Sequence, residues 1–206
     1  MLGSLQYLLA GITFGSAGGF TPGPTLTLVI SQTLRHGLRE GLKIAISPLL
    51  TDAPIILLAI FVLQRIDTGP VLGAIAFVGA AFLFYLTYES FTATPPAPGM
   101  RAIDPDSLRK GILANLLNPH PWVFWLSIGG PMTLRALEVG SVAATLFLAG
   151  HYGCLVGAKV LIAVLVEKGR SRLGRGYRYA MRFLALVLAV FALLFVREGL
   201  RYTGLF

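Results

Sequence analysis

The sequence contains few charged residues. Lys, Arg, Asp and Glu make up 13% of its 206 residues, whereas a soluble domain carries about 25%. Hydrophobic residues account for 55%, and the mean hydropathy is +0.76. This composition excludes an ordinary soluble domain and predicts an all-α, polytopic membrane protein. Because each spanning helix needs about 20 residues, six spans would leave room only for short connections.

Other absences narrow the range of functions. The single cysteine, Cys154, allows neither an intrachain disulfide nor a relay of two thiols for electron transfer. The sequence has no G-x-x-x-x-G-K-[ST] motif, so we exclude an ATP-driven pump with a P-loop. No Ser/His or paired-acid arrangement indicates an intramembrane hydrolase. We therefore expect no enzymatic activity and no cofactor.

Basic residues are concentrated in alternate connections between the apolar runs. The net charge of +8 and the pI of about 10.1 would suggest nucleic-acid binding in a soluble protein. Here the first, third and fifth connections hold most of the Lys and Arg residues: Arg35, Arg39, Lys43, Arg101, Arg109, Lys110, Lys168, Arg170, Arg172, Arg175, Arg178 and Arg182. The opposite side holds only Arg65, Arg135, Arg197 and Arg201. The positive-inside rule then predicts cytoplasmic odd-numbered connections, both termini outside and no nucleic-acid partner.

Apolar runs predict six spanning helices in a single domain over residues 1–206. Their approximate ranges are 5–33, 44–64, 70–88, 111–134, 141–166 and 183–197. The first run lacks a basic start and is too long for a signal-peptide core, so we expect a retained span. A Pro-rich link at about 91–107 separates two halves, about 1–90 and 108–206, which enter from opposite sides as inverted three-helix repeats. If the sixth run were peripheral, the C-terminus would move inside.

Proline-containing breaks interrupt the first and fourth predicted spans. The first is Gly18-Gly19-Phe20-Thr21-Pro22-Gly23-Pro24, in a stretch without a charged side chain from Met1 to Leu34, and the second is Asn118-Pro119-His120-Pro121. Each proline removes a backbone hydrogen bond that lipid cannot replace, so such breaks are tolerated where they line a wet cavity or are buried in protein. A simple structural kink is the alternative. The candidate substrate-binding residues are Thr21, Pro22, Gly23, Pro24, Asn118, Pro119 and His120.

The two breaks are predicted at one depth in the membrane. At 1.5 Å per residue, counting from the nearest basic residue places both on the order of 12–17 Å from the cytoplasmic side. One half-helix then begins near Pro22 and runs inward, and the other begins near Asn118 and runs outward. Free N–H groups at helix starts bind anions, so we expect a substrate carboxylate between them. Asn118 as N-cap and Pro119 at the first helical position fit this polarity.

Few ionisable residues lie within the predicted spans: Asp52, His120, His151 and Lys159. A charge at the centre of a membrane helix costs at least about 2.5–3.5 kcal/mol, so it needs a partner or a function. Asp52, the only carboxylate in these spans, and Lys159 are predicted at the same depth. They are candidates for an ion pair that either couples transport to protons or only stabilises the fold. His120 is a candidate for proton transfer or a structural hydrogen bond, whereas we expect His151 to pack or to form a hydrogen bond.

Several of these motifs together resemble the LysE/RhtB family of amino-acid exporters. They are Thr21-Pro22-Gly23-Pro24, Gly37, Gly41, Asp52, Gly111 and Asn115-Leu116-Leu117-Asn118-Pro119. The resemblance covers nearly the whole chain. It implies six spans, proton-linked export of amino acids or related metabolites, and a place in the cytoplasmic (inner) membrane of a prokaryote. Family members commonly have a lysine two residues after the Asn-Pro pair, where this chain has Pro121, so the resemblance is to a divergent branch.

The predicted function is secondary transport. The expected partners are an amino-acid-like small molecule, protons and the lipid bilayer, and a homo-oligomer is left open. The main alternative is a channel built on the same broken-helix scaffold. A divalent-cation transporter is a second alternative, although one embedded carboxylate is few for such a cation. We expect Trp122, Trp125 and Tyr152 to pack or to lie at the membrane interface, not to form a substrate cage.

Overall fold

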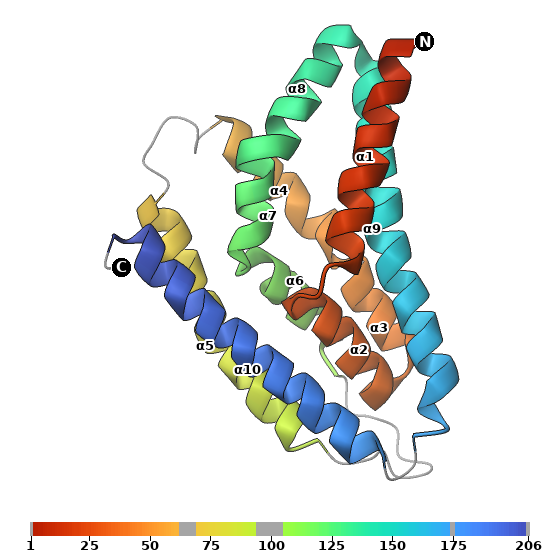
Figure 1. The fold of residues 1–206 in the computed structure, drawn as a ribbon, viewed down its shortest axis with the longest axis vertical. Coiled ribbons are helices and arrows are strands. Elements are labelled where there is room, and N and C mark those ends of the chain that lie inside the picture. The colour runs from red at the N-terminus through yellow and green to blue at the C-terminus, as the bar shows by residue number, and fades with distance from the viewer. Residues whose placement is uncertain (1, 62–68, 94–104, 174–175, 205–206) are drawn as a thin grey trace.

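The computed structural model describes residues 2–61, 69–93, 105–173 and 176–204. Within these ranges the chain forms α-helices and one short π-helical segment, with no strand (Figure 1). The elements are α1 (Leu2–Phe20), α2 (Pro24–His36), α3 (Leu38–Ala45), α4 (Ser47–Phe61), α5 (Gly69–Phe91), α6 (Ser107–Leu116), α7 (Pro119–Phe124), η2 (Trp125–Gly129), α8 (Gly130–Val139), α9 (Ser141–Arg170) and α10 (Gly176–Tyr202). The all-α prediction is confirmed.

Within the described residues, four helical stretches are long and apolar enough to cross a membrane: Leu38–Leu58, Gly69–Phe91, Ser141–Arg170 and Gly176–Tyr202. They correspond to the second, third, fifth and sixth predicted spans. The last two extend beyond their predicted ends because helical geometry continues through polar residues at the membrane surface. The first and fourth predicted spans are divided into shorter helices, α1 with α2 and α6 with α7, η2 and α8. The chain is therefore a helical membrane protein, while the count of six spans stays a prediction.

Both helix breaks occur at the residues that the sequence singles out. The first helix ends at Phe20, and α2 begins at Pro24 after an extended Gly23 with φ −166° and ψ 173°. The helix α6 ends at Leu116, and α7 begins at Pro119 after Asn118 in an extended conformation. In both places proline occupies the first helical position. The N–H group at this position has no partner within the helix, so its absence in proline costs no hydrogen bond.

The N-terminal helix α1 packs along α9, far away in the sequence (Figure 1). Glycines repeat at every fourth residue on the face of α1 that touches α9. A Cβ atom on Gly11 would overlap the carbonyl oxygen of Phe147, and one on Gly15 would overlap that of His151. On Gly19 it would lie 2.7 Å from the Cβ of Ala158. Small residues let membrane helices approach this closely, so van der Waals contact between backbones holds the pair.

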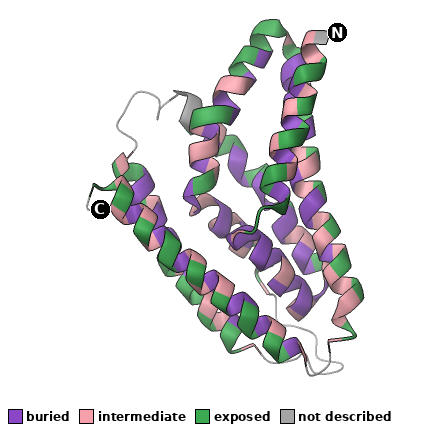
Figure 2. Ribbon diagram, in the orientation of Figure 1, coloured by how far each residue is buried: buried purple, intermediate pink, exposed green. Residues whose placement is uncertain are grey.

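Helices α5 and α10 form a second long pair, which is tilted away from the other helices (Figure 1). Figure 2 shows buried residues where α2, α3, α6 and α7 meet, and exposed residues along the outer sides of α5 and α10. The exposed side chains on α10 include Phe183, Leu186, Val190 and Leu193. A continuous apolar face of this size needs a cover, and the lipid tails of a bilayer supply it.

The basic connections meet at one end of the molecule. On α5, Glu89 Oε1 accepts hydrogen bonds from Arg35 Nη1 at 2.7 Å and from Lys110 Nζ at 2.6 Å. Arg170, at the end of α9, donates to the carbonyl oxygens of Leu34 and Arg35. The described parts of the first, third and fifth connections thus lie together, as one membrane face requires. Arg65, Arg101, Arg175 and residues 94–104 of the predicted link lie outside the described residues.

Candidate functional site

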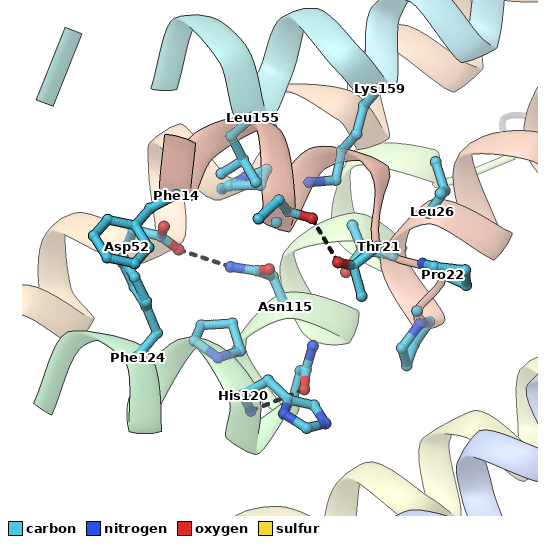
Figure 3. Close-up of a pocket in the computed structure, with 18 of the residues that line it drawn as sticks. Phe14, Thr21, Pro22, Leu26, Asp52, Asn115, His120, Phe124, Leu155 and Lys159 are labelled. Atoms are coloured by element: carbon cyan, nitrogen blue, oxygen red, sulfur yellow. Dashed lines mark hydrogen bonds between the residues drawn. The ribbon is translucent and has the colours of Figure 1, made fainter. Parts of the chain in front are cut away.

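A cavity of about 360 Å³ lies between the two helix breaks (Figure 3). Its walls come from α1, α2, α4, α6, α7, η2, α9 and α10. The volume is at the lower end of the range found for small-molecule sites, about 300–1,000 Å³. The size therefore suits a small metabolite and not a large ligand.

The structure brings nearly all of the predicted site residues to this cavity. The lining residues among them are Thr21, Pro22, Gly23, Pro24, Asp52, Asn118, His120 and Lys159. Pro119, at the start of α7, is buried and is not among the residues that line the cavity. Residues of both breaks therefore line one cavity, whereas their depth in a membrane and their roles in binding and coupling stay predictions.

The second break is held by a side-chain cap. Asn118 Oδ1 accepts a hydrogen bond from the backbone N–H of His120 at 3.0 Å, which is the N-cap interaction that satisfies an otherwise unpaired donor. The helical segment that starts here continues from α7 through the π-helical turn of η2 into α8, which ends at Val139. The start of α2, at Pro24, Thr25 and Leu26, also lines the cavity.

Asp52 is the centre of a buried hydrogen-bond network. Its side chain is buried on α4 and accepts a bond from Asn115 Nδ2 to Oδ1 at 2.8 Å. Trp125 Nε1 and Tyr152 Oη both donate to Oδ2, at 3.2 and 3.3 Å. Asn115 Nδ2 also donates to Thr51 Oγ1 at 2.7 Å. Hydrogen bonds from three other elements, α6, η2 and α9, thus keep this carboxylate in one position at the cavity wall.

Sequence reasoning missed the three donors to Asp52. It assigned Trp125 and Tyr152 to packing or to the membrane interface, and it used Asn115 only as part of the family motif. A signal was present for Asn115, which precedes the predicted site residue Asn118 by only three residues and lines the same cavity. No comparable signal existed for Trp125, which is 73 residues away from Asp52 in the sequence, so no local spacing indicates their contact.

Lys159 has no direct carboxylate partner in this structure. Its side chain is 95% buried on α9 and points into the cavity (Figure 3). Among the described residues, no carboxylate oxygen lies within 4.0 Å of its Nζ atom. The predicted pair with Asp52 is therefore not formed in this conformation, and it stays a prediction for another one. The ammonium group and the Asp52 carboxylate instead face one cavity.

His151 is built into an aromatic cluster at the cavity wall. Its ring stacks on Phe124 with a centroid distance of 5.1 Å and an angle of 9°. The rings of Trp125 and Tyr152 meet it edge-on at 5.5 and 5.2 Å. The expected packing role is thus visible in the contacts, but His151 also lines the cavity, and its buried Nδ1 has no hydrogen-bond partner among the described residues.

His120 meets a carboxylate that sequence reasoning did not consider. Its Nε2 atom lies 3.5 Å from Oε1 of Glu198 on α10. The predicted sixth span ended at residue 197, so the sequence analysis did not consider Glu198. In the structure α10 continues to Tyr202 and includes Glu198.

The described residues contain no group of three or more His, Cys, Asp and Glu side chains that could hold a metal ion. The cavity wall carries oxygen and nitrogen groups that can contact a polar organic molecule, including those of Asp52, Asn118, His120 and Lys159. The rest of the wall is largely aromatic or aliphatic, including Phe14, Phe124, Leu155 and Phe191.

Comparisons with known proteins place these residues in a wider context. The family model described as LysE type translocator matches residues 16–199. A membrane protein of Escherichia coli (strain K12), the uncharacterized YahN, is 29% identical over 196 residues, which cover 87% of this chain and 84% of that protein. A cysteine/O-acetylserine efflux protein of Salmonella typhimurium (strain LT2) is 24% identical over 192 residues, covering 86% and 89%. The corresponding protein of Salmonella typhi is also 24% identical, with the same coverage. No solved structure matches the chain.

Proposed function

Because the chain belongs to the LysE-type translocator family, we propose that it is a secondary transporter that exports amino acids or related small metabolites and is coupled to proton entry. Family membership makes the protein a membrane transporter and not an enzyme. The observation that supports amino-acid export best is the placement of one carboxylate, Asp52, and one ammonium group, Lys159, on the same small cavity. An amino acid carries the complementary pair of charges.

The cavity suggests how an amino acid would be oriented. Its carboxylate would lie near Lys159 and the N-terminus of α2, where free N–H groups and the helix dipole favour an anion. Its ammonium group would lie near Asp52, whose oxygens are held in place by Asn115, Trp125 and Tyr152. Phe14, Phe124 and Phe191 offer apolar contact to the remaining atoms of the ligand.

Proton coupling would use the same two charges. Ionised Asp52 binds the substrate ammonium group when the cavity faces the cytoplasm, and a proton that enters from outside neutralises Asp52 and releases the substrate. Loss of that proton to the cytoplasm restores the Asp52 charge, which attracts Lys159 until the next substrate binds between them. The direct ion pair belongs to this substrate-free state of the cycle.

We also propose the membrane arrangement that the sequence predicts. Six spans would form two inverted repeats over residues 1–90 and 108–206 in the inner membrane of a prokaryote, with both termini outside. The meeting of Arg35, Lys110 and Arg170 at one end of the molecule supports a common, cytoplasmic side for the odd-numbered connections. A homo-oligomer remains open.

Transport in proteoliposomes tests this function. Vesicles with purified protein and an imposed pH gradient should accumulate a labelled amino acid in a saturable manner, and collapse of the gradient should lower accumulation about tenfold. The first probes are L-cysteine and O-acetyl-L-serine, since relatives are named for them, followed by L-lysine. Flux that never saturates would instead indicate a channel, and uptake of Mn²⁺ without amino-acid flux would indicate a cation transporter. Comparing metabolites in cells with and without the protein would identify the natural substrate.

Replacing Asn118 by leucine should lower export more than tenfold while the protein still inserts. Loss of an N-cap costs about 1 kcal/mol, and the freed N–H of His120 would shift the start of α7 at the cavity. The measurement is proteoliposome flux together with the amount of protein in the membrane. Asn118→Ser is the matched control because serine can cap the helix, and it should keep most of the activity. Equal loss of protein from the membrane in both variants would show that the residue is needed only for folding.

A further inference from the structure

We propose that Glu198 is a proton-coupling residue, which forms with His120 a proton-binding pair that links α10 to α7 at the edge of the cavity. The inference rests on the proposed proton-coupled export. It adds a second coupling site to the one formed by Asp52 and Lys159, on a different helix and on the opposite side of the cavity. The argument starts from the way in which α10 meets the rest of the protein.

One face of α10 is directed toward α7 and the cavity. Phe191 lines the cavity, the ring of Phe195 lies 6.3 Å from that of His120, and Glu198 Oε1 lies 3.5 Å from His120 Nε2. The spacing of four and then three residues places these side chains in one row along the helix. A change at Glu198 is therefore transmitted along the same row to a wall of the cavity.

The two carboxylate oxygens of Glu198 have different surroundings. Oε1 faces the imidazole of His120, whereas Oε2 is buried and has no hydrogen-bond partner among the described residues. A buried carboxylate oxygen without a partner is costly as an anion. A proton stabilises the pair, either on His120, which makes a charge-assisted bond to the carboxylate, or on Glu198 itself. Histidine is suited to this exchange because its charge changes near neutral pH.

Among the described residues, His120 is the group able to carry a positive charge that lies within 4.0 Å of the Glu198 carboxylate. On α5, the residues opposite this part of α10 are Gly73 and Phe77, which have no charge. On α10 itself, Arg197, Arg201 and Tyr202 are the ionisable neighbours, and both arginines are exposed to the outside of the fold. On the far wall of the cavity, the ionisable groups are Asp52 on α4 and both His151 and Lys159 on α9.

The pair also lies where α5 and α10 join the other helices. At one end of the helix pair, Glu89 on α5 binds Arg35 and Lys110. Toward the other end, Glu198 on α10 meets His120. When the His120–Glu198 pair holds its proton, a charge-assisted bond fixes α10 against α7. When the proton leaves, the bond weakens and the Phe191 wall can withdraw, which exposes the cavity.

The test uses the full chain in proteoliposomes with labelled L-cysteine, or with the amino acid of highest flux in the panel above. Glu198→Gln should lower flux driven by a pH gradient about tenfold, while exchange of labelled for unlabelled amino acid at equal pH falls much less. The pH dependence of flux should also flatten. Glu198→Asp keeps a carboxylate and should restore part of the gradient-driven flux. Glu138→Gln, an exposed glutamate on α8, is the matched control and should behave as the wild type.

The outcomes separate this inference from the proposed function. Wild-type protein without gradient-driven flux would contradict proton-coupled export itself. Coupled wild-type flux that persists with an unchanged pH profile in Glu198→Gln would overturn only the role of Glu198. Equal loss of exchange and of gradient-driven flux would show a structural role, and it would overturn the coupling role as well. If Glu198→Gln fails to fold, an unchanged pH profile in Glu198→Asp overturns the inference.

Discussion

Replacing Asp52 by asparagine should lower export about a hundredfold or more. The carboxylate accepts bonds from Asn115, Trp125 and Tyr152 in a buried position. An amide keeps one acceptor oxygen and turns an NH₂ group toward the remaining donors, so at least one bond is lost. A hydrogen bond to a charged group is worth about 1.5–3 kcal/mol, and the negative charge that balances Lys159 is lost in addition. Flux in proteoliposomes, normalised to the amount of folded protein, measures the effect.

The matched control is an exposed carboxylate. Asp106→Asn removes a surface pair with Arg109 at 3.3 Å, and surface pairs contribute little, so flux should stay near that of the wild type. Stability should fall in Asp52→Asn and not in Asp106→Asn. Normal folding and export by Asp52→Asn would remove both the structural and the coupling role of the Asp52 carboxylate.

The structure also changes what we expect from exchanging the two charges. If Asp52 and Lys159 acted only as an ion pair, the double variant Asp52→Lys, Lys159→Asp would recover folding better than either single change. A lysine at position 52, however, cannot accept the bonds of Asn115, Trp125 and Tyr152. We therefore expect recovery only in part.

Replacing Gly15 by leucine should prevent stable folding. A Cβ at this position overlaps the carbonyl oxygen of His151 and lies 2.8 Å from its carbonyl carbon. Backbone atoms of a helix cannot move aside as a flexible side chain can, so α1 must separate from α9. Overpacking costs about 1–3 kcal/mol even where side chains adjust, and we expect more here. Thermal unfolding in detergent, followed as the fraction of monodisperse protein, measures the loss.

Two glycines on α9 are the matched controls. An added Cβ at Gly153 or Gly157 meets no atom within 4 Å. Leucine at either position should therefore leave the unfolding temperature within a few degrees of that of the wild type. If Gly15→Leu were as stable as Gly157→Leu, the close backbone packing of α1 on α9 would be wrong.

The sequence allowed the position of the site to be predicted better than its internal contacts. The breaks at Pro24 and Asn118 could be placed in one layer because depth along a helix follows from residue count. Which way a side chain faces depends on helix rotation and packing, so the network around Asp52 was not foreseen. The π-helical turn at Trp125–Gly129 adds to this, because it rotates every residue after it. Glu198 was missed for a simpler reason, the early end assigned to the last span.

The close packing of α1 on α9 also determines when the protein can be completed during synthesis. Chains are made and inserted from the N-terminus, so α1 enters the bilayer long before the ribosome has produced α9. Until then the glycine face of α1 has only lipid beside it, and the backbone at residues 21–23 has no protein wall. The cavity cannot form on a nascent chain that stops before Lys159. A chain truncated before α9 therefore has neither a packing partner for the glycine face of α1 nor a complete cavity.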